Sequence, residues 1–208
     1  MAYKLLVLDI DGTVTNSDKK VLKETREAVV HLQEKGIHVA IASGRAPQGI
    51  YSVAEELELD RFGNYILAFK YTIAASERCG NLRAEINFPV HGCLLTGDPV
   101  NIVVMEPEFV RKYCHEPEIF RSEPCFLEVV SKNVDKAYSL KYLLRIFGIP
   151  REKMVCCGDC FNDISMIQFA GLGVAMANGQ EKLKMITNYV TDADNDHNGI
   201  AEVIGKFF

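Results

Sequence analysis

Four short segments, far apart along the chain, carry residue types that could perform one chemical task together. They are Asp9-Ile10-Asp11-Gly12-Thr13, Ser43-Gly44-Arg45, Lys136 and Gly158-Asp159-Cys160-Phe161-Asn162-Asp163. Together they offer a carboxylate nucleophile, a neighbouring acid/base, phosphate donors, a cation and acidic metal ligands. These are the parts that phosphoryl transfer through an aspartyl-phosphate requires.

The first segment supplies the reacting groups. We assign Asp9 as the nucleophile and Asp11 as the general acid/base that protonates the leaving oxygen and then activates water. Gly12 lets the backbone turn tightly and approach the phosphate. The hydroxyl groups of Thr13 and Ser43 are expected to donate hydrogen bonds to that phosphate.

A cation must balance the negative charge that gathers at such a site, and we assign this role to Lys136. It is expected in the first turn of a helix, where backbone N–H groups and the helix dipole favour a phosphate. Lys132 competes for the role, but Lys136 directly follows a plausible N-cap. Gly44 joins Ser43 in the expected substrate-binding set.

The last segment supplies the expected metal site. Asp159 and Asp9 would bind Mg²⁺, a hard cation that prefers oxygen ligands. Asp163 would not bind the metal itself but would orient the residues that do. Asn162 would hold the substrate phosphate or fix the acidic turn. Without the metal, these carboxylates would repel a phosphate dianion.

Two further features have alternative interpretations. Arg45 would either reach the substrate or pair with a carboxylate of the core. Cys157 and Cys160 form a C-x-x-C pattern, but there is no second such pair, and small residues that fill a strand end are the simpler interpretation. The five histidines show no ligand spacing.

Alternating strands and helices are expected to position these residues. We expect parallel strands to alternate with helices in two stretches of the chain, one before and one after a middle segment with a different pattern. The expected strands are 4–8, 37–42, 65–69, 154–157, 173–176 and 189–191. The expected helices are 19–34, 48–57, 136–147, 163–170 and 181–187. Asn133 or Asp135 would cap the helix that begins near Lys136. This alternation indicates a doubly wound, Rossmann-like α/β fold in which ligands bind at the carboxyl ends of the strands.

The middle of the chain breaks this alternation. We expect a hairpin over 72–76 and 84–88, a loop over 91–99, strands over 101–105 and 126–130, and a short helix near 108–115. This predicts a discontinuous core, 1–85 with 127–208, and a small α/β cap over 86–126. Such a cap is too small to be stable alone.

Composition limits the classes of partner. The chain has 208 residues, 48% of them hydrophobic, and a formal net charge of −5. It shows no block of basic residues and no apolar run long enough to cross a membrane, so we expect no nucleic-acid partner and no membrane partner. Seven cysteines, an odd number, favour reduced thiols in a cytoplasmic protein. We expect a monomer or a weak homodimer.

The four segments resemble the haloacid dehalogenase (HAD) superfamily of phosphohydrolases. The run 171–178, with Asp194-Asn195-Asp196 and Gly199-Ile200, looks like the Cof-type subfamily, whose α/β cap lies between the second and third motifs. The resemblance implies Mg²⁺-dependent hydrolysis of phosphate monoesters, often sugar phosphates or other small phosphorylated metabolites. It also implies that the backbone carbonyl of Asp11 binds the metal.

Two departures from that family concern the substrate. Phe69-Lys70-Tyr71 stands where Asn-Gly-Ala is usual, and the cap is shorter than usual, as if a helix and a strand were missing around 91–98. We expect a phosphatase with broad specificity. The alternatives are a catalytically weak phosphate- or Mg²⁺-binding regulatory protein and a phosphotransferase or phosphomutase with the same site.

Overall fold

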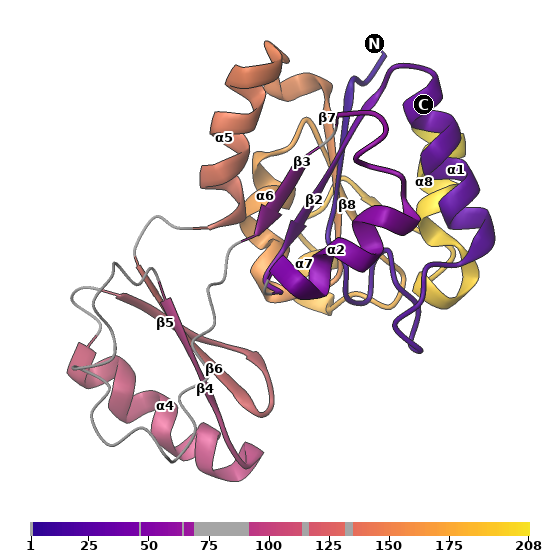
Figure 1. The fold of residues 1–208 in the computed structure, drawn as a ribbon. Coiled ribbons are helices and arrows are strands. Elements are labelled where there is room, and N and C mark those ends of the chain that lie inside the picture. The colour runs from indigo at the N-terminus through magenta and orange to yellow at the C-terminus, as the bar shows by residue number, and fades with distance from the viewer. Residues whose placement is uncertain (1, 46, 64, 69–91, 114–116, 132–134) are drawn as a thin grey trace. The chain divides into compact units, whose positions relative to one another are not determined.

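The chain folds into two compact units, and each is described by itself. The structure, a computed structural model, describes residues 2–45, 47–63, 65–68, 92–113, 117–131 and 135–208 (Figure 1). The first unit comprises Met1–Phe69 and Asp135–Phe208, and the second comprises Lys70–Val134. The second unit is therefore longer than the cap of 86–126 expected from the sequence. Both expected boundaries lie inside this unit.

A six-stranded parallel sheet forms the centre of the first unit. Its order is β3-β2-β1-β7-β8-β9. The strands are β1 (Leu5–Leu8), β2 (His38–Ser43), β3 (Tyr65–Ala68), β7 (Met154–Gly158), β8 (Leu172–Ala175) and β9 (Tyr189–Val190). Strands β1 and β7 are buried throughout, as expected for central strands of a parallel sheet. The predicted doubly wound α/β fold is confirmed.

Helices cover both faces of this sheet (Figure 1). They are α1 (Lys23–Glu34), α2 (Pro47–Glu56), α5 (Lys136–Phe147), α6 (Ile164–Phe169), α7 (Glu181–Lys184) and α8 (Gly199–Phe207). Because successive strand residues point to opposite faces, Leu6 and Leu8 join the core with α1, α2 and α8, whereas Leu5 and Val7 join the core with α5 and α6.

Helix α8 was not predicted, although its apolar residues have helical spacing. Ile200, Val203 and Ile204 are buried, and the helix packs against α1. Its first residue, Gly199, is in close contact with the carbonyl of Ala193, so a Cβ there would clash. The C-terminus of the chain therefore completes one of the two cores.

The second unit contains a three-stranded antiparallel sheet and one long helix. The sheet order is β4-β6-β5, with β4 (Gly92–Thr96), β5 (Pro117–Glu123) and β6 (Phe126–Ser131). Helix α4 (Pro99–Tyr113) packs against β5 and β6. A domain boundary at 126/127 would divide the paired strands β5 and β6, so the whole sheet belongs to one unit.

Two predictions for this unit were wrong. Residues 101–105 were expected as a strand because they are rich in β-branched residues, but they lie inside α4. The carboxylate of Asp98 accepts the N–H of Val100 at 2.9 Å, and Pro99 takes the first helical position, so two helix-start signals prevail. Residues expected as a loop form β4. The predicted hairpin over 72–88 lies outside the described residues.

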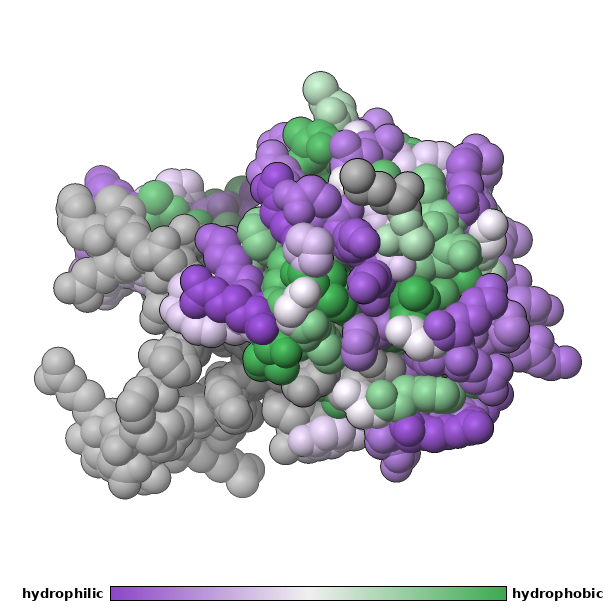
Figure 2. Space-filling view, turned by 90° about the horizontal axis from the view of Figure 1, so that it is seen from above, coloured by the Kyte–Doolittle hydropathy of each residue, from purple (hydrophilic) through white to green (hydrophobic). Residues whose placement is uncertain are grey.

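The surface of the molecule mixes polar and apolar side chains. Figure 2 shows the side on which the N-terminus lies, where hydrophilic residues predominate and smaller hydrophobic areas are interspersed. Such a mixture is ordinary for folded proteins. Among the described residues, no helix has the length and apolar character needed to cross a membrane.

Candidate active site

The strand order reverses between β1 and β7, and this is where parallel α/β sheets bind ligands. Asp9 directly follows β1, and Asp159 directly follows β7. The N–H of Asp9 donates to the carbonyl of Cys157 at 3.1 Å, which joins the two strand ends. The topology thus places two aspartates from distant parts of the chain next to each other.

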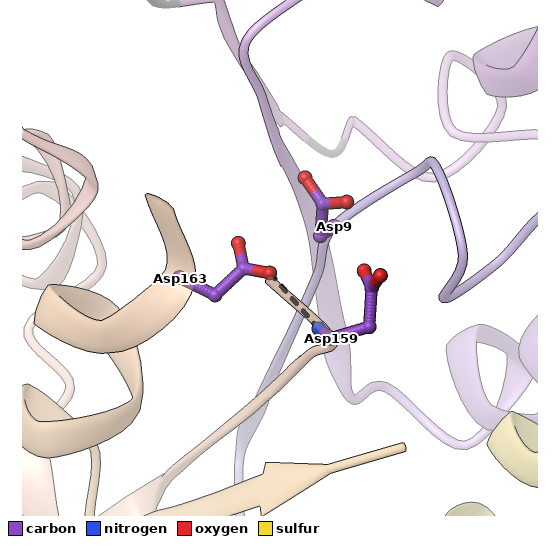
Figure 3. Close-up of side chains that lie close together, drawn as sticks. All are labelled: Asp9, Asp159 and Asp163. Atoms are coloured by element: carbon purple, nitrogen blue, oxygen red, sulfur yellow. Dashed lines mark hydrogen bonds between the residues drawn. The ribbon is translucent and has the colours of Figure 1, made fainter. Parts of the chain in front are cut away.

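Three carboxylates form the centre of the site. Oxygen atoms of Asp9, Asp159 and Asp163 lie within 4.8 Å of one another. In Figure 3, Asp163 faces the other two aspartates across a small space. Asp163 comes from the short helical turn Phe161–Asp163 that follows β7. Carboxylates this close repel one another unless a cation lies among them.

Lys136 supplies one such cation. Its ammonium group is buried and forms ion pairs with both Asp9 and Asp163. Burial alone would lower the pKa of Lys136, but the two carboxylates outweigh it and raise the pKa. Lys136 opens α5, and Asp135 is the N-cap, with its side chain accepting the N–H of Tyr138 at 2.7 Å. Lys132, the competing lysine, lies outside the described residues.

One lysine does not balance three carboxylates. Burial raises the pKa of Asp9 to about 7; Lys136 opposes this rise, and Asp163 adds to it. Burial also raises the pKa of Asp159 to about 8, with further contributions from Asp163 and Asp9. Full ionisation of this centre at neutral pH therefore requires an additional positive charge.

Asp163 is held more firmly than the other two aspartates. Its Oδ2 accepts the N–H groups of Asp159 and Cys160 at 2.9 and 3.0 Å, while Oδ1 accepts from Lys136. A Cβ on Gly158 would clash with this carboxylate, so the strand must end in glycine here. Asp163 thus orients both the turn that carries Asp159 and the lysine.

The first segment wraps closely around Asp159. Gly12 has a φ of +74°, a region that favours glycine, and a Cβ at this position would overlap the carboxylate of Asp159. The buried hydroxyl of Thr13 donates to Oδ1 of Asp159 at 3.1 Å. The buried hydroxyl of Ser43 accepts the N–H of Arg45 at 3.1 Å and lies in the bend with Gly44 at the end of β2.

Asp11 lies outside the group of three carboxylates and has its own partners. Arg45 donates to both of its oxygens, at 2.6 and 2.7 Å, and Lys19 donates to Oδ1 at 2.7 Å. Burial opposes ionisation of Asp11, but these hydrogen bonds outweigh it and lower its pKa to about 2. Of the two roles open to Arg45, the structure therefore shows pairing with a carboxylate. Lys19 was not singled out by the sequence, because a lysine in a polar turn carries no distinctive signal.

The remaining predicted residues lie in the turn after β7. The side-chain oxygen of Asn162 is buried and has no hydrogen-bond partner among the described residues. Cys157 is buried and is a free thiol, and the sulfur of the partly buried Cys160 accepts a hydrogen bond from the side-chain amide of Gln180 at 3.3 Å. Burial also raises the pKa of the Cys157 thiol, which makes it a poor metal ligand or nucleophile. Cys157 is thus a packing residue at the end of β7.

The centre suits a hard divalent cation. It offers three carboxylates within a small volume, and the unpartnered oxygen of Asn162 belongs to the same turn. The two raised pKa values indicate that the site lacks positive charge. Oxygen donors with excess negative charge are the ligands that hard divalent cations prefer.

An Asp-x-Asp at the end of the first strand and a lysine-bridged acidic turn after its neighbour define a hydrolase of the HAD type. The sequence model described as haloacid dehalogenase-like hydrolase matches residues 6–73 and 64–204. The chain therefore belongs to this family, as its motifs predicted.

Individual relatives cover the whole chain. A haloacid dehalogenase-like hydrolase from Bacteroides thetaiotaomicron has a TM-score of 0.86 and 33% identity and covers 99% of this chain and 100% of its own. The 5-amino-6-(5-phospho-D-ribitylamino)uracil phosphatase YcsE of Bacillus subtilis is 29% identical, over 97% of this chain and 94% of its own. The HAD subclass IIB sugar phosphatase BT4131 shares the fold, with a TM-score of 0.78 at 24% identity and 98% coverage of both chains. The protein is an enzyme of the HAD phosphatase type.

Proposed function

We propose that the protein is a Mg²⁺-dependent phosphatase that hydrolyses small phosphate monoesters through an aspartyl-phosphate. The observation that carries this proposal is the buried centre of Asp9, Asp159 and Asp163 at the point where the strand order reverses, with Lys136 among the carboxylates. A candidate nucleophile, a cation and candidate ligands for a hard metal lie close together there, which supports the proposal.

In the first step, a carboxylate oxygen of Asp9 attacks phosphorus, and the bond from phosphorus to the ester oxygen breaks. The negative charge of the bound phosphate favours the protonated form of Asp11, which gives its proton to the departing oxygen, so an alcohol leaves. In the second step, water attacks the phosphoryl group and gives a proton to Asp11. The acyl-phosphate bond then breaks, inorganic phosphate leaves, and Asp9 is restored as a carboxylate.

The metal would be held by Asp9, Asp159 and the backbone carbonyl of Asp11, and Asp163 would orient the turn that carries Asp159. When bound, it neutralises the charge of the phosphate and of the carboxylates. Lys136 keeps Oδ1 of Asp9 in place through its ion pair. Ser43, Gly44 and Asn162 would bind the phosphate oxygens, and Thr13 would join them when its hydroxyl turns from Asp159 to the phosphate.

We further propose that the substrates are several small phosphorylated metabolites rather than one. The alignment with the B. subtilis phosphatase extends over 238 residues, more than the 208 of this chain, so that relative has residues absent here. The family match is split into two pieces that meet at 64–73, beside the start of the inserted unit. A shorter insertion leaves fewer side chains to recognise the leaving group. The free thiols favour a cytoplasmic enzyme.

The test is a panel of phosphorylated metabolites and 4-nitrophenyl phosphate, assayed with Mg²⁺ and with EDTA. Release of phosphate should require Mg²⁺, and Asp9→Asn should abolish it because an amide does not attack phosphorus. Asp192→Asn, the same change in the exposed C-terminal segment, serves as the control. Binding of phosphate and Mg²⁺ without turnover would instead indicate the regulatory protein, and transfer to a sugar acceptor would indicate a phosphotransferase.

A further inference from the structure

Three hydrogen bonds hold the carboxylate of Asp11, although the side chain is 41% exposed. Nε of Arg45 donates to Oδ2 and Nη2 to Oδ1, and Nζ of Lys19 also donates to Oδ1. A two-point contact with a guanidinium fixes the plane of a carboxylate. Nη1 of Arg45 donates to the carbonyl of Gly49 at 2.9 Å, which anchors the guanidinium to α2.

Lys19 reaches Asp11 from a tight turn with an uncommon backbone conformation. Its φ is +62°, which costs free energy for a residue other than glycine and persists where surrounding contacts impose it. The side-chain oxygen of Asn16 accepts the N–H groups of Asp18 and Lys20 at 3.1 and 2.9 Å. These bonds stabilise the turn that carries the lysine.

The C-terminal segment fixes the same loop from the other side. The carboxylate of Asp196 accepts both the N–H and the hydroxyl of Ser17, each at 2.7 Å. The buried side chain of Asn195 donates to the carbonyl of Thr15 at 3.0 Å. The loop that leads from Asp11 to Lys19 is therefore attached to residues nearly 180 positions away in the sequence.

We propose that Lys19 and Arg45 are positioning residues for Asp11, and that the attachment of residues 15–17 to Asn195 and Asp196 holds Lys19 in place. The inference rests on the proposed function, in which Asp11 is the acid/base. Oδ1 accepts two hydrogen bonds and Oδ2 accepts one, so Oδ2 retains the capacity to carry the transferred proton.

The experiment compares two leaving groups in single turnovers of the full chain with Mg²⁺. The glycerol that leaves glycerol 1-phosphate must receive a proton, whereas the 4-nitrophenolate that leaves 4-nitrophenyl phosphate needs none. Lys19→Ala and Arg45→Ala should slow glycerol release by about 10-fold or more but 4-nitrophenol release by less than about 3-fold, because only the first needs a well-placed acid. KM, measured separately in the steady state, should change little.

Matched variants separate positioning from charge and from folding. Lys20→Ala removes the adjacent exposed lysine and should behave like wild type. Arg45→Lys keeps the charge but offers no rigid fork, so its rate should lie between those of wild type and Arg45→Ala. Asp196→Ala should reproduce part of the Lys19→Ala effect, whereas Asp192→Ala should not.

A double-mutant cycle tests whether both residues act through Asp11. In the Asp11→Asn background, Lys19→Ala and Arg45→Ala should cause no further loss with glycerol 1-phosphate. An undiminished loss there, equal slowing of both leaving groups, or a rise in KM at constant kcat would overturn the inference. A wild-type protein without any turnover would instead refute the proposed function.

Discussion

At the scale of single residues, the site is defined by buried charge. Lys136 is buried, which is rare for a lysine. Its ion pairs with Asp9 and Asp163 compensate for its loss of hydration. The raised pKa values of Asp9 and Asp159 show that this compensation is incomplete without a further cation. The centre of the site thus lacks positive charge, which a divalent metal would supply.

Replacement of Lys136 should be costly for catalysis. Lys136→Met keeps the length of the side chain but leaves Asp9 and Asp163 without their common cation, so we expect kcat/KM to fall by about 10²-fold or more. The measurement is steady-state hydrolysis of 4-nitrophenyl phosphate, with circular dichroism to verify folding. Lys132→Met is the matched control, and a larger loss there would show that the wrong lysine was chosen.

The metal-free protein should become less stable as the pH rises. Asp159 has a folded pKa of about 8 against an ordinary value of 3.8, so between these values the folded chain binds more protons than the unfolded chain. Its contribution falls with increasing pH, by at most about 1.4 kcal/mol per pH unit. Urea unfolding in EDTA between pH 5 and 8 should show a steeper loss for wild type than for Asp159→Asn. Mg²⁺ should restore stability at pH 8 in wild type only; parallel curves would contradict the assignment.

At the scale of elements, short connections aim the reacting groups. The end of β1 carries Asp9, the turn after β7 carries Asp159 and Asp163, and the first turn of α5 carries Lys136. Glycine at position 12 allows its loop to approach Asp159 closely, and glycine at position 158 leaves space for the side chain of Asp163. Each element therefore both supplies a group and leaves space for the group of its neighbour.

The N-cap of α5 should affect both stability and activity. Asp135→Ala removes the bond to the N–H of Tyr138, which should cost about 1 kcal/mol in the free energy of unfolding. Because Lys136 is the next residue, we expect a decrease in kcat as well. Urea unfolding and phosphate-release assays measure the two effects. Asp135→Asn, which retains a capping side chain, should stay close to wild type; an equal loss there would exclude the cap as the cause.

At the scale of the whole molecule, the chain interrupts one fold to insert another. The parallel sheet is assembled from both ends of the sequence, and the unit Lys70–Val134 enters between β3 and α5. The inserted unit has a sheet of its own and a helix packed on it, and none of the proposed catalytic residues lies in it. Substrate range is the property that we expect it to control.

The short insertion should leave the enzyme unselective. Across a panel of small phosphates, we expect kcat/KM values within about 10⁴ of one another, since larger ratios usually demand dedicated polar contacts. Substitutions within Glu106–Glu118 should change the order of substrates more than the rate with 4-nitrophenyl phosphate. One substrate preferred beyond that ratio would show that the insertion is a selective lid.

Much of the fold could be predicted because it depends on local pattern. The buried runs that become β1, β2 and β7, and the helical spacing of α1 and α5, directly reflect the period of each structure. The second unit was predicted less well. Residues of α4 have a strand-like composition, but the cap at Asp98 and packing against the sheet favour a helix. The local pattern does not encode that packing.

The sequence by itself determined which residues are candidates for the chemistry, because these residues lie in the segments that follow the strands or in the first turn of a helix. Only the tertiary structure decided how they pair. It placed Arg45 and Lys19 on Asp11, Lys136 between Asp9 and Asp163, and Asp196 on the loop near the site. These contacts join residues from separate elements, and their partners are chosen by distance and burial, which composition and spacing do not specify.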